Sequence, residues 1–170
     1  MPIPKALFGL MFVLLALPAC AADVLLTMNS YGSIRIGMNV DDAYRELKKM
    51  GREKLARPDK VESVGCGYYI PYAGLAFMTE KRRIVRIETQ ETDVVTPSGI
   101  RVGDSISKVR AKFGSRLTDS KQFYSDNPED RTLVVVANDG KTAMRFEADR
   151  NVTDIYAGYE NAIHFVEGCD

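Results

Sequence analysis

The feature that most constrains the fold is an internal similarity between two segments of the chain. Residues 33–47 read SIRIGMNVDDAYREL, and residues 99–113 read GIRVGDSISKVRAKF. Both segments run from an extended stretch through a glycine into an amphipathic stretch, at an offset of 66 residues. Self-similarity at a fixed spacing is typical of a duplicated structural unit. We therefore predict that the mature chain contains two copies of one pattern.

Each copy is predicted to begin with a helix. Asn39 and Ser105 stand at N-cap positions, directly before the first apolar residue of a helical spacing. Gly51 and Gly114 follow the apolar pattern and are typical of helix ends. Strand patterns come after each helix, at residues 67–70, 74–78 and 84–89 in the first copy and at 133–137, 142–148, 152–159 and 162–166 in the second.

These elements predict an α+β fold made of two tandem repeats, each a helix followed by an antiparallel β-meander. The chain then divides into residues 1–22, 23–95 and 96–170, and the boundary between the repeats falls in the segment 91–98. A single repeat of about 65 residues would bury only a marginal core. The two repeats are therefore expected to pack together.

Residues 1–22 are predicted to be a secretory signal peptide. Lys5 supplies the charged n-region, residues 6–17 form an apolar run, and residues 18–22 provide the small residues of a cleavage site. The apolar run is too short to cross a bilayer as a helix. Two cleavage schemes stay open: Cys20 is either the lipidated first residue of a lipoprotein or a part of the removed peptide.

The number of cysteines also favours export. The chain has three, Cys20, Cys66 and Cys169, and both cleavage schemes take Cys20 out of disulfide pairing. Cys66 and Cys169 then form an even pair in an oxidising compartment, so we expect a disulfide between them. In the chain-entropy model, closing a loop of this size stabilises a fold by up to about 4.7 kcal/mol.

The short segment before each predicted helix resembles a group of small exported α+β domains. The group includes the BamE/SmpA-like outer-membrane lipoproteins and the tandem-repeat proteins that are similar to β-lactamase inhibitory proteins. The resemblance implies a protein that binds other proteins, through enzyme inhibition in one branch and scaffold assembly in the other, and it implies no catalytic residues. The matching residues are Ile34, Ile36, Gly37 and Met38 in the first copy and Ile100, Val102, Gly103 and Asp104 in the second.

Few residues are suited to catalysis or to metal binding. There are 23 basic (Lys+Arg) and 23 acidic (Asp+Glu) residues, and this balance argues against a nucleic-acid partner. The one histidine, His164, lies in an alternating strand pattern and is expected at the surface. Asp41 and Asp42 fall in the first turn of a helix, where they complement its dipole. The acidic segment 118–130 lacks the spacing of a calcium loop and is expected to be a solvated loop. We therefore predict a protein that is not an enzyme and has no cofactor or metal.

Five aromatic residues are the candidate contacts for a protein partner. Alternation along a strand places Tyr68 and Tyr69 on opposite faces, so one of them points away from the core. Tyr72 extends this group, and Phe123 and Tyr124 stand in an otherwise polar segment. Aromatic residues are enriched at interface hot spots, and tyrosine combines a large contact area with a polar group.

The sequence thus predicts an exported protein-binding module, such as an inhibitor or immunity-type protein that acts on an enzyme of the cell envelope. The alternative is a structural or assembly lipoprotein of the bacterial outer membrane, anchored through Cys20. A third hypothesis is a hydrolase, which would require two convergent acids with a raised pKa. The predicted location is the periplasm or the outer membrane, and the predicted membrane contact is limited to the lipid anchor.

Overall fold

The computed structural model of the protein describes residues 24–52, 54–166 and 168–169. The predicted signal peptide and the candidate lipidation site Cys20 lie outside the described residues. Within the described part of the chain, no helix is long and apolar enough to span a membrane.

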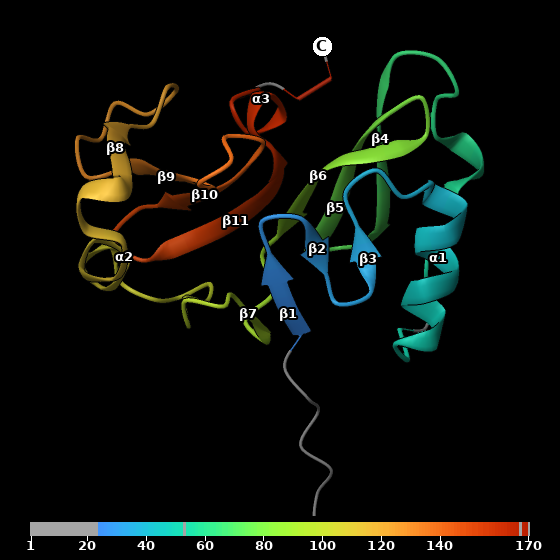
Figure 1. The fold of residues 1–170 in the computed structure, drawn as a ribbon, viewed down its shortest axis with the longest axis horizontal. Helices are drawn as coiled ribbons and strands as arrows, with labels where there is room; N and C mark the ends of the chain where they lie inside the picture. The colour runs from blue at the N-terminus through green and yellow to red at the C-terminus, as the bar shows by residue number, and fades with distance from the viewer. Residues whose placement is uncertain (1–23, 53, 167, 170) are drawn as a thin grey trace, which may run out of the picture.

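Seven strands form one continuous antiparallel sheet in the order β4-β5-β6-β11-β10-β9-β8 (Figure 1). The strands β6 and β11 come from different halves of the chain, and their pairing joins the two halves. The bounds are β4 (Cys66–Tyr72), β5 (Leu75–Glu80), β6 (Arg83–Thr89), β8 (Leu117–Lys121), β9 (Arg131–Val136), β10 (Thr142–Ala148) and β11 (Val152–Tyr159).

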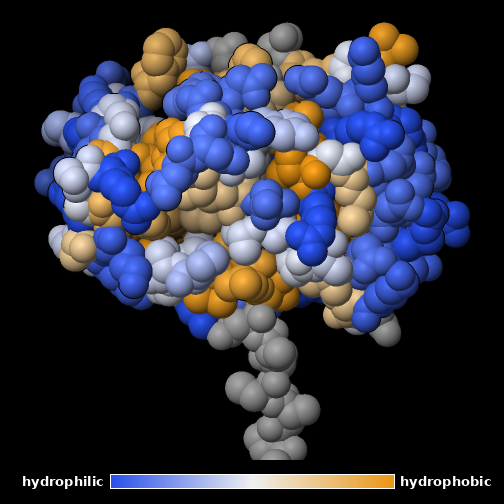
Figure 2. Space-filling model, in the orientation of Figure 1, coloured by the Kyte–Doolittle hydropathy of each residue, from blue (hydrophilic) through white to orange (hydrophobic). Residues whose placement is uncertain are grey.

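A second sheet of short strands has the order β3-β2-β1-β7, and only the β1–β7 pair is parallel. Two helices, α1 and α2, lie on either side of this small sheet (Figure 1). Figure 2 shows that the surface over α1 is largely hydrophilic. The bounds are β1 (Val24–Thr27), β2 (Ser30–Tyr31), β3 (Ile34–Arg35), β7 (Val94–Val95), α1 (Val40–Lys49), α2 (Ile106–Phe113) and α3 (Glu160–Ile163).

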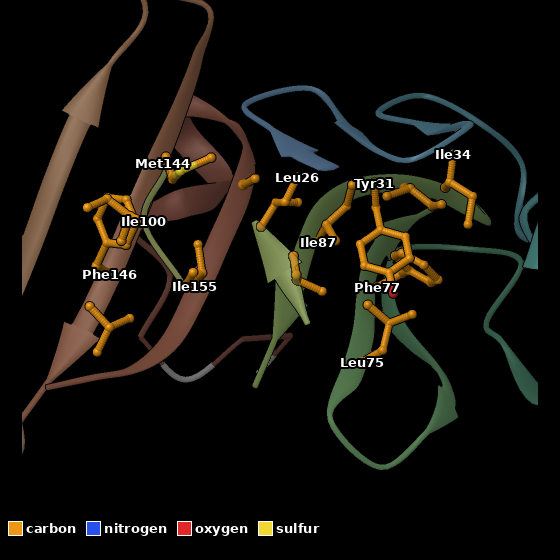
Figure 3. Packing of buried hydrophobic residues seen from close by; sticks show 14 of the residues in the cluster. Leu26, Tyr31, Ile34, Leu75, Phe77, Ile87, Ile100, Met144, Phe146 and Ile155 are labelled. Carbon is orange, nitrogen blue, oxygen red and sulfur yellow. The ribbon is translucent and has the colours of Figure 1, made fainter. Parts of the chain in front are cut away.

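The hydrophobic core lies between the large sheet on one side and the small sheet and helices on the other. Strand alternation gives the large sheet one apolar face, and this inner face contributes side chains from both halves of the chain to one cluster. Figure 3 shows the side chains of the cluster pointing toward one another from the two sheets. The labelled residues are Leu26, Tyr31, Ile34, Leu75, Phe77, Ile87, Ile100, Met144, Phe146 and Ile155.

The predicted fold class is wrong. The protein is mostly β, with 41% strand and 19% helix, and its described residues form eleven strands and three short helices rather than two tandem repeats of helix and meander. The physical reason is that β6 pairs with β11, so the two halves share one sheet instead of forming one each. In addition, the short segments 24–35 and 94–95 form a second sheet that the pattern did not predict.

The predicted starts of the two main helices are confirmed. The Asn39 side chain accepts a backbone N–H of α1 at 2.9 Å, and the Ser105 side chain accepts one of α2 at 3.2 Å. The glycine two residues before each N-cap also forms an equivalent backbone hydrogen bond in the two halves. Gly37 N–H donates to a carbonyl of β6 at 2.7 Å, and Gly103 N–H donates to a carbonyl of β11 at 2.8 Å. The similarity between the halves is therefore local.

Two further segments differ from the prediction. The segment 118–130, expected to be a loop, begins with four residues of β8. The predicted last strand, 162–166, is instead the end of α3 and the chain that follows it. The reason is that two buried arginines of the large sheet, Arg86 and Arg145, donate to carbonyls of this segment and replace the strand neighbour that it would otherwise need.

Candidate functional site

The outer face is the face of the seven-stranded sheet opposite the core. Residues that pair directly across an antiparallel ladder point to the same side, so the register identifies the members of this face. It contains charged and aromatic side chains near the middle of the sheet, and α3 packs over a part of it. These members are Tyr68, Arg86, Glu88, Arg145, Glu147, Asp154 and Tyr156.

Arg86 is the most deeply buried of these side chains, at 2% exposure, and all of its N–H groups are used. Its Nε and Nη2 donate to Glu88 Oε1 at 2.9 and 2.7 Å, and its Nη1 donates to the carbonyls of Ala162 and Phe165 at 2.7 and 2.8 Å. Its Nη2 also donates to the Tyr68 hydroxyl at 2.8 Å. This cluster therefore holds the C-terminal segment on the sheet and offers no free donor to a ligand.

Arg145 is buried as well, at 5% exposure, but it is not fully satisfied. Its Nη1 donates to the Ile163 carbonyl at 2.7 Å, and its guanidinium stacks 4.1 Å from the centre of the Tyr156 ring. Its Nε lies 3.2 Å from Glu147 Oε1, yet it forms no hydrogen bond within the described part of the protein. Its positive charge is therefore compensated by the Glu147 carboxylate, although the geometry of a hydrogen bond between the two is not met.

Glu147 is the acid that accompanies Arg145. Both of its carboxylate oxygens accept a hydrogen bond from the Thr132 hydroxyl, at 3.1 and 2.8 Å. Burial raises the pKa of Glu147, and the charge of Asp154, which pairs with Glu147 across the strands, acts in the same direction. Arg145 and Thr132 oppose this shift. The result is a partly desolvated ion pair on the outer face, in β10 beside the part that α3 covers.

The aromatic hollow lies over this ion pair and has a volume of about 320 Å³. Phe123 and Tyr124 form one side of it, and their side chains are strongly exposed, at 76% and 66%. Their rings pack edge to face, with centroids 4.8 Å apart. The residues that define the aromatic hollow are Ser120, Lys121, Gln122, Phe123, Tyr124, Thr132, Arg145, Glu147, Tyr156, His164 and Val166.

The five aromatic residues predicted as partner contacts do not lie together. Tyr69 is in the core, with 1% of its surface exposed. Tyr68 is on the outer face, as alternation requires, but the C-terminal segment packs against its ring at Gly168. Tyr72 belongs to a partly buried network, in which its hydroxyl donates to Glu91 at 3.0 Å. Phe123 and Tyr124 are thus the two that combine high exposure with a hollow.

The predicted disulfide is confirmed. Cys66 and Cys169 are bonded, with their Cα atoms 5.3 Å apart and 103 positions apart in the sequence. Cys66 is the first residue of β4, so the bond ties the C-terminal segment to one edge of the large sheet. The segment 56–62 runs along the same edge: the Ala56 N–H donates to the Pro71 carbonyl at 2.8 Å.

The other acidic candidates are engaged in ion pairs. Asp41 accepts two hydrogen bonds from Arg82, and Asp42 pairs with Arg45 on the surface of α1. His164 lies just after α3 and contacts Glu160 at 2.9 Å. Among the described residues, no group of three or more histidine, cysteine or acidic side chains converges as a metal site would require.

Arg145 and Glu147 were not among the predicted site residues, although the sequence contains a signal for them. The strand pattern of residues 142–148 has Phe146 on the core face, which places its two charged neighbours together on the opposite face. Charged residues inside such an apolar strand are costly unless paired. Their presence in β10 was therefore a usable indication of a polar cluster on the outer face.

Comparisons with known proteins report one distant likeness in structure. No family model matches the chain, and no curated protein matches it. A crystal structure of an extracellular protein containing an SCP domain from Bacillus anthracis str. Ames is similar over part of its length, with a TM-score of 0.44 and 12% sequence identity. The match covers 75% of this chain and 45% of that protein.

Proposed function

We propose that the protein is an exported protein-binding module that engages its partner at the aromatic hollow. The observation that carries the proposal is the pair Phe123 and Tyr124, which expose 76% and 66% of their surface beside a buried, incompletely satisfied Arg145. Solvent-exposed aromatic rings next to a hollow gain from desolvation when a partner covers them.

The composition of the hollow fits a protein partner. Interface hot spots are enriched in tyrosine, tryptophan and arginine, and they centre on pockets from which water is excluded on binding. The hollow combines two aromatic rings, the half-exposed Val166 and the buried guanidinium of Arg145. In the described part of the chain, His164 of the hollow contacts the Glu160 carboxylate at 2.9 Å.

The disulfide supports export. Bonds of this type form and persist in oxidising compartments, and Cys66 and Cys169 are bonded in the folded protein. Together with the leader predicted in residues 1–22, the disulfide supports a partner in the cell envelope or outside the cell. The narrower form of the proposal is an inhibitor or immunity-type protein that blocks an envelope enzyme.

The experiment compares partner capture by three forms of the mature protein. The double variant Phe123→Ser/Tyr124→Ser removes the exposed rings and leaves the core untouched. The matched control is Val64→Ser, because Val64 is 79% exposed but precedes β4 at the other end of the large sheet. We expect the wild type and the control to retain one envelope protein at equal yield, and the double variant to lose at least nine-tenths of it. Equal capture by all three forms would contradict the proposal.

A further inference from the structure

The two edge strands of the large sheet, β4 and β8, differ in how far other segments cover them. The edge strand β4 is flanked by the segment 56–62 and contains Pro71, whose carbonyl accepts the Ala56 N–H. The other edge strand, β8, has β9 as its sole neighbour in the sheet. Within the described residues, no segment outside the β8–β9 hairpin forms a backbone hydrogen bond with residues 118–121. An uncovered edge presents a row of N–H and C=O groups that can pair with another strand.

The register identifies which backbone groups point away from β9. Gln122 N–H donates to the Asp130 carbonyl at 3.0 Å, and the β8–β9 pairing continues this ladder along the strand. Because hydrogen-bonded and non-bonded pairs alternate in an antiparallel ladder, Ser120 and Thr118 use their backbone groups toward β9. The N–H and C=O groups of Asp119 and Lys121 are therefore directed outward.

The inner side of this edge is positively charged. The Asp119 carboxylate accepts hydrogen bonds from Arg110 Nε and Arg131 Nε, both at 2.7 Å. Lys121 lies two positions further along the strand, so its side chain points to the same face as Asp119. Two arginines thus pair with one carboxylate, and Lys121 adds a further positive charge to the same strand. A strand added at this edge would be favoured by an acidic side chain directed to this face.

The outer side of the same edge is aromatic. Ser120 points to the outer face and is a member of the aromatic hollow, together with Phe123 and Tyr124 just beyond the end of β8. A strand added beside β8 would direct every second side chain toward this hollow. An aromatic or aliphatic side chain at that position would cover the two exposed rings.

We propose that β8 accepts an extended strand of a partner protein, whose alternate side chains are acidic toward Arg110, Arg131 and Lys121 and apolar toward the aromatic hollow. This is β-strand addition, in which backbone hydrogen bonds supply affinity and alternate side chains supply specificity. The proposal rests on the protein-binding function proposed above, and it adds the form and charge pattern of the segment that is bound.

The test uses the mature protein and a synthetic probe, a nine-residue peptide in which glutamate alternates with phenylalanine or valine, capped at both ends. Two derivatives carry N-methyl groups on alternate amides. In the first derivative the methylated amides point to one edge of the extended peptide, and in the second they point to the opposite edge. We expect the parent peptide to bind. We also expect methylation of one edge to weaken binding at least tenfold and methylation of the other edge to have little effect, because only one edge can face β8.

The variant Lys121→Pro tests the hydrogen bond between the outward N–H of residue 121 and the added strand. Proline has no N–H to donate there, but the ladder between β8 and β9 is kept, and proline is tolerated at such edge positions. Lys121→Ala is the matched control, since it removes the same charge but keeps the N–H group. We expect Lys121→Pro to bind the parent peptide about tenfold more weakly than Lys121→Ala, with both variants showing the wild-type circular dichroism spectrum.

Four results would overturn strand addition, and the last of them leaves the protein-binding function standing. The first is that the parent peptide does not bind, and the second is that both methylated derivatives bind equally well. The third is a dimer of the protein that Lys121→Pro dissociates, because it would show that a second copy occupies β8. If Lys121→Pro captures the envelope partner as well as the wild type does, while Phe123→Ser/Tyr124→Ser fails to, the protein-binding function stands and strand addition is wrong.

Discussion

The two ends of the seven-stranded sheet differ in what covers their edge strands, β4 and β8. At the closed end, β4 is tied to the C-terminus by the Cys66–Cys169 disulfide and flanked by the segment 56–62. At the open end, β9 is the one strand that pairs with β8 among the described residues, and Phe123 and Tyr124 of the β8–β9 hairpin are exposed to solvent.

Under the proposed function, this difference separates stability at the closed end from recognition at the open end. At the closed end the Tyr72 hydroxyl donates to Glu91, and burial raises the pKa of Tyr72 to about 12. The open end has outward backbone groups on β8 and the exposed rings of Phe123 and Tyr124. Exposed aromatic surface and unpaired edges are a liability in a protein that acts alone, and they are expected where a partner binds.

The largest expected effect on stability comes from removing the disulfide at the closed end. In Cys66→Ala/Cys169→Ala, the denatured chain regains the entropy that the long loop removes, so the free energy of unfolding should fall by about 4 kcal/mol. Urea denaturation, with and without reductant, measures this change. Reductant should lower the midpoint for the wild type and leave the double variant unaffected. A loss below about 1 kcal/mol would show that the closed end does not depend on the disulfide.

The second effect concerns the junction between the ends. A Cβ atom on Gly158 of β11 would lie 2.3 Å from the Val85 carbonyl oxygen and 2.8 Å from Arg86 Cα, both in β6. Gly158→Ala should therefore force the strands apart and lower the free energy of unfolding by about 3 kcal/mol. Gly67→Ala is the control, since its Cβ would come no nearer than 3.4 Å to Glu62. Equal stability of the two variants in urea denaturation would mean that the halves are not joined as described.

The third effect is a pH dependence of the open end. Burial raises the pKa of Asp119, but hydrogen bonds from Arg110 and Arg131 outweigh it and hold the pKa below its ordinary value. A carboxylate with a lowered folded pKa stabilises the protein above its unfolded pKa, and this contribution is lost as the pH falls through the folded value. Asp119→Asn should thus cost about 1 kcal/mol at pH 7.

The difference between the wild type and Asp119→Asn should shrink as the pH falls below about 4, where the unfolded carboxyl group begins to hold its proton. Thermal unfolding of both proteins across the acid range measures it. A difference that is constant with pH would show that the carboxylate charge of Asp119 contributes nothing to the stability of this end.

The smallest expected effect on stability comes from the exposed rings. Phe123→Ser/Tyr124→Ser removes side chains that lie largely in solvent, so the free energy of unfolding should change by no more than about 0.5 kcal/mol. The same variant is expected to lose partner binding. Urea denaturation checks the first statement, and a loss above about 2 kcal/mol would show that the rings serve the fold rather than recognition.

The sequence predicted the local structure better than the architecture. Helix caps at Asn39 and Ser105 depend on a few adjacent residues, and both are found where the pattern indicated. The pairing of β6 with β11 depends on which strand edges meet in space, and no spacing along the chain reports that. The prediction of a last strand at 162–166 was wrong for a similar reason. Carbonyls of this segment accept hydrogen bonds from Arg86 and Arg145, which lie in strands far away in the sequence.

The candidate site was predictable only in part. Phe123 and Tyr124 stand out in the sequence as aromatic residues in a polar segment, and both are exposed. Tyr69 and Tyr72 looked similar in the sequence, yet Tyr69 lies in the core and the Tyr72 hydroxyl is bound to Glu91. Which aromatic residue reaches solvent depends on the small sheet and the segment 56–62, and therefore on tertiary packing.

Site-specific photo-cross-linking in the host cells tests the central claim most directly. A photoreactive phenylalanine analogue would be introduced at Phe123 in the open end and, separately, at Val64 in the closed end, since both side chains are strongly exposed. The account predicts one discrete adduct with an envelope protein from position 123 and none from position 64. A discrete adduct from position 64 with none from position 123 would contradict it and would place recognition at the closed end.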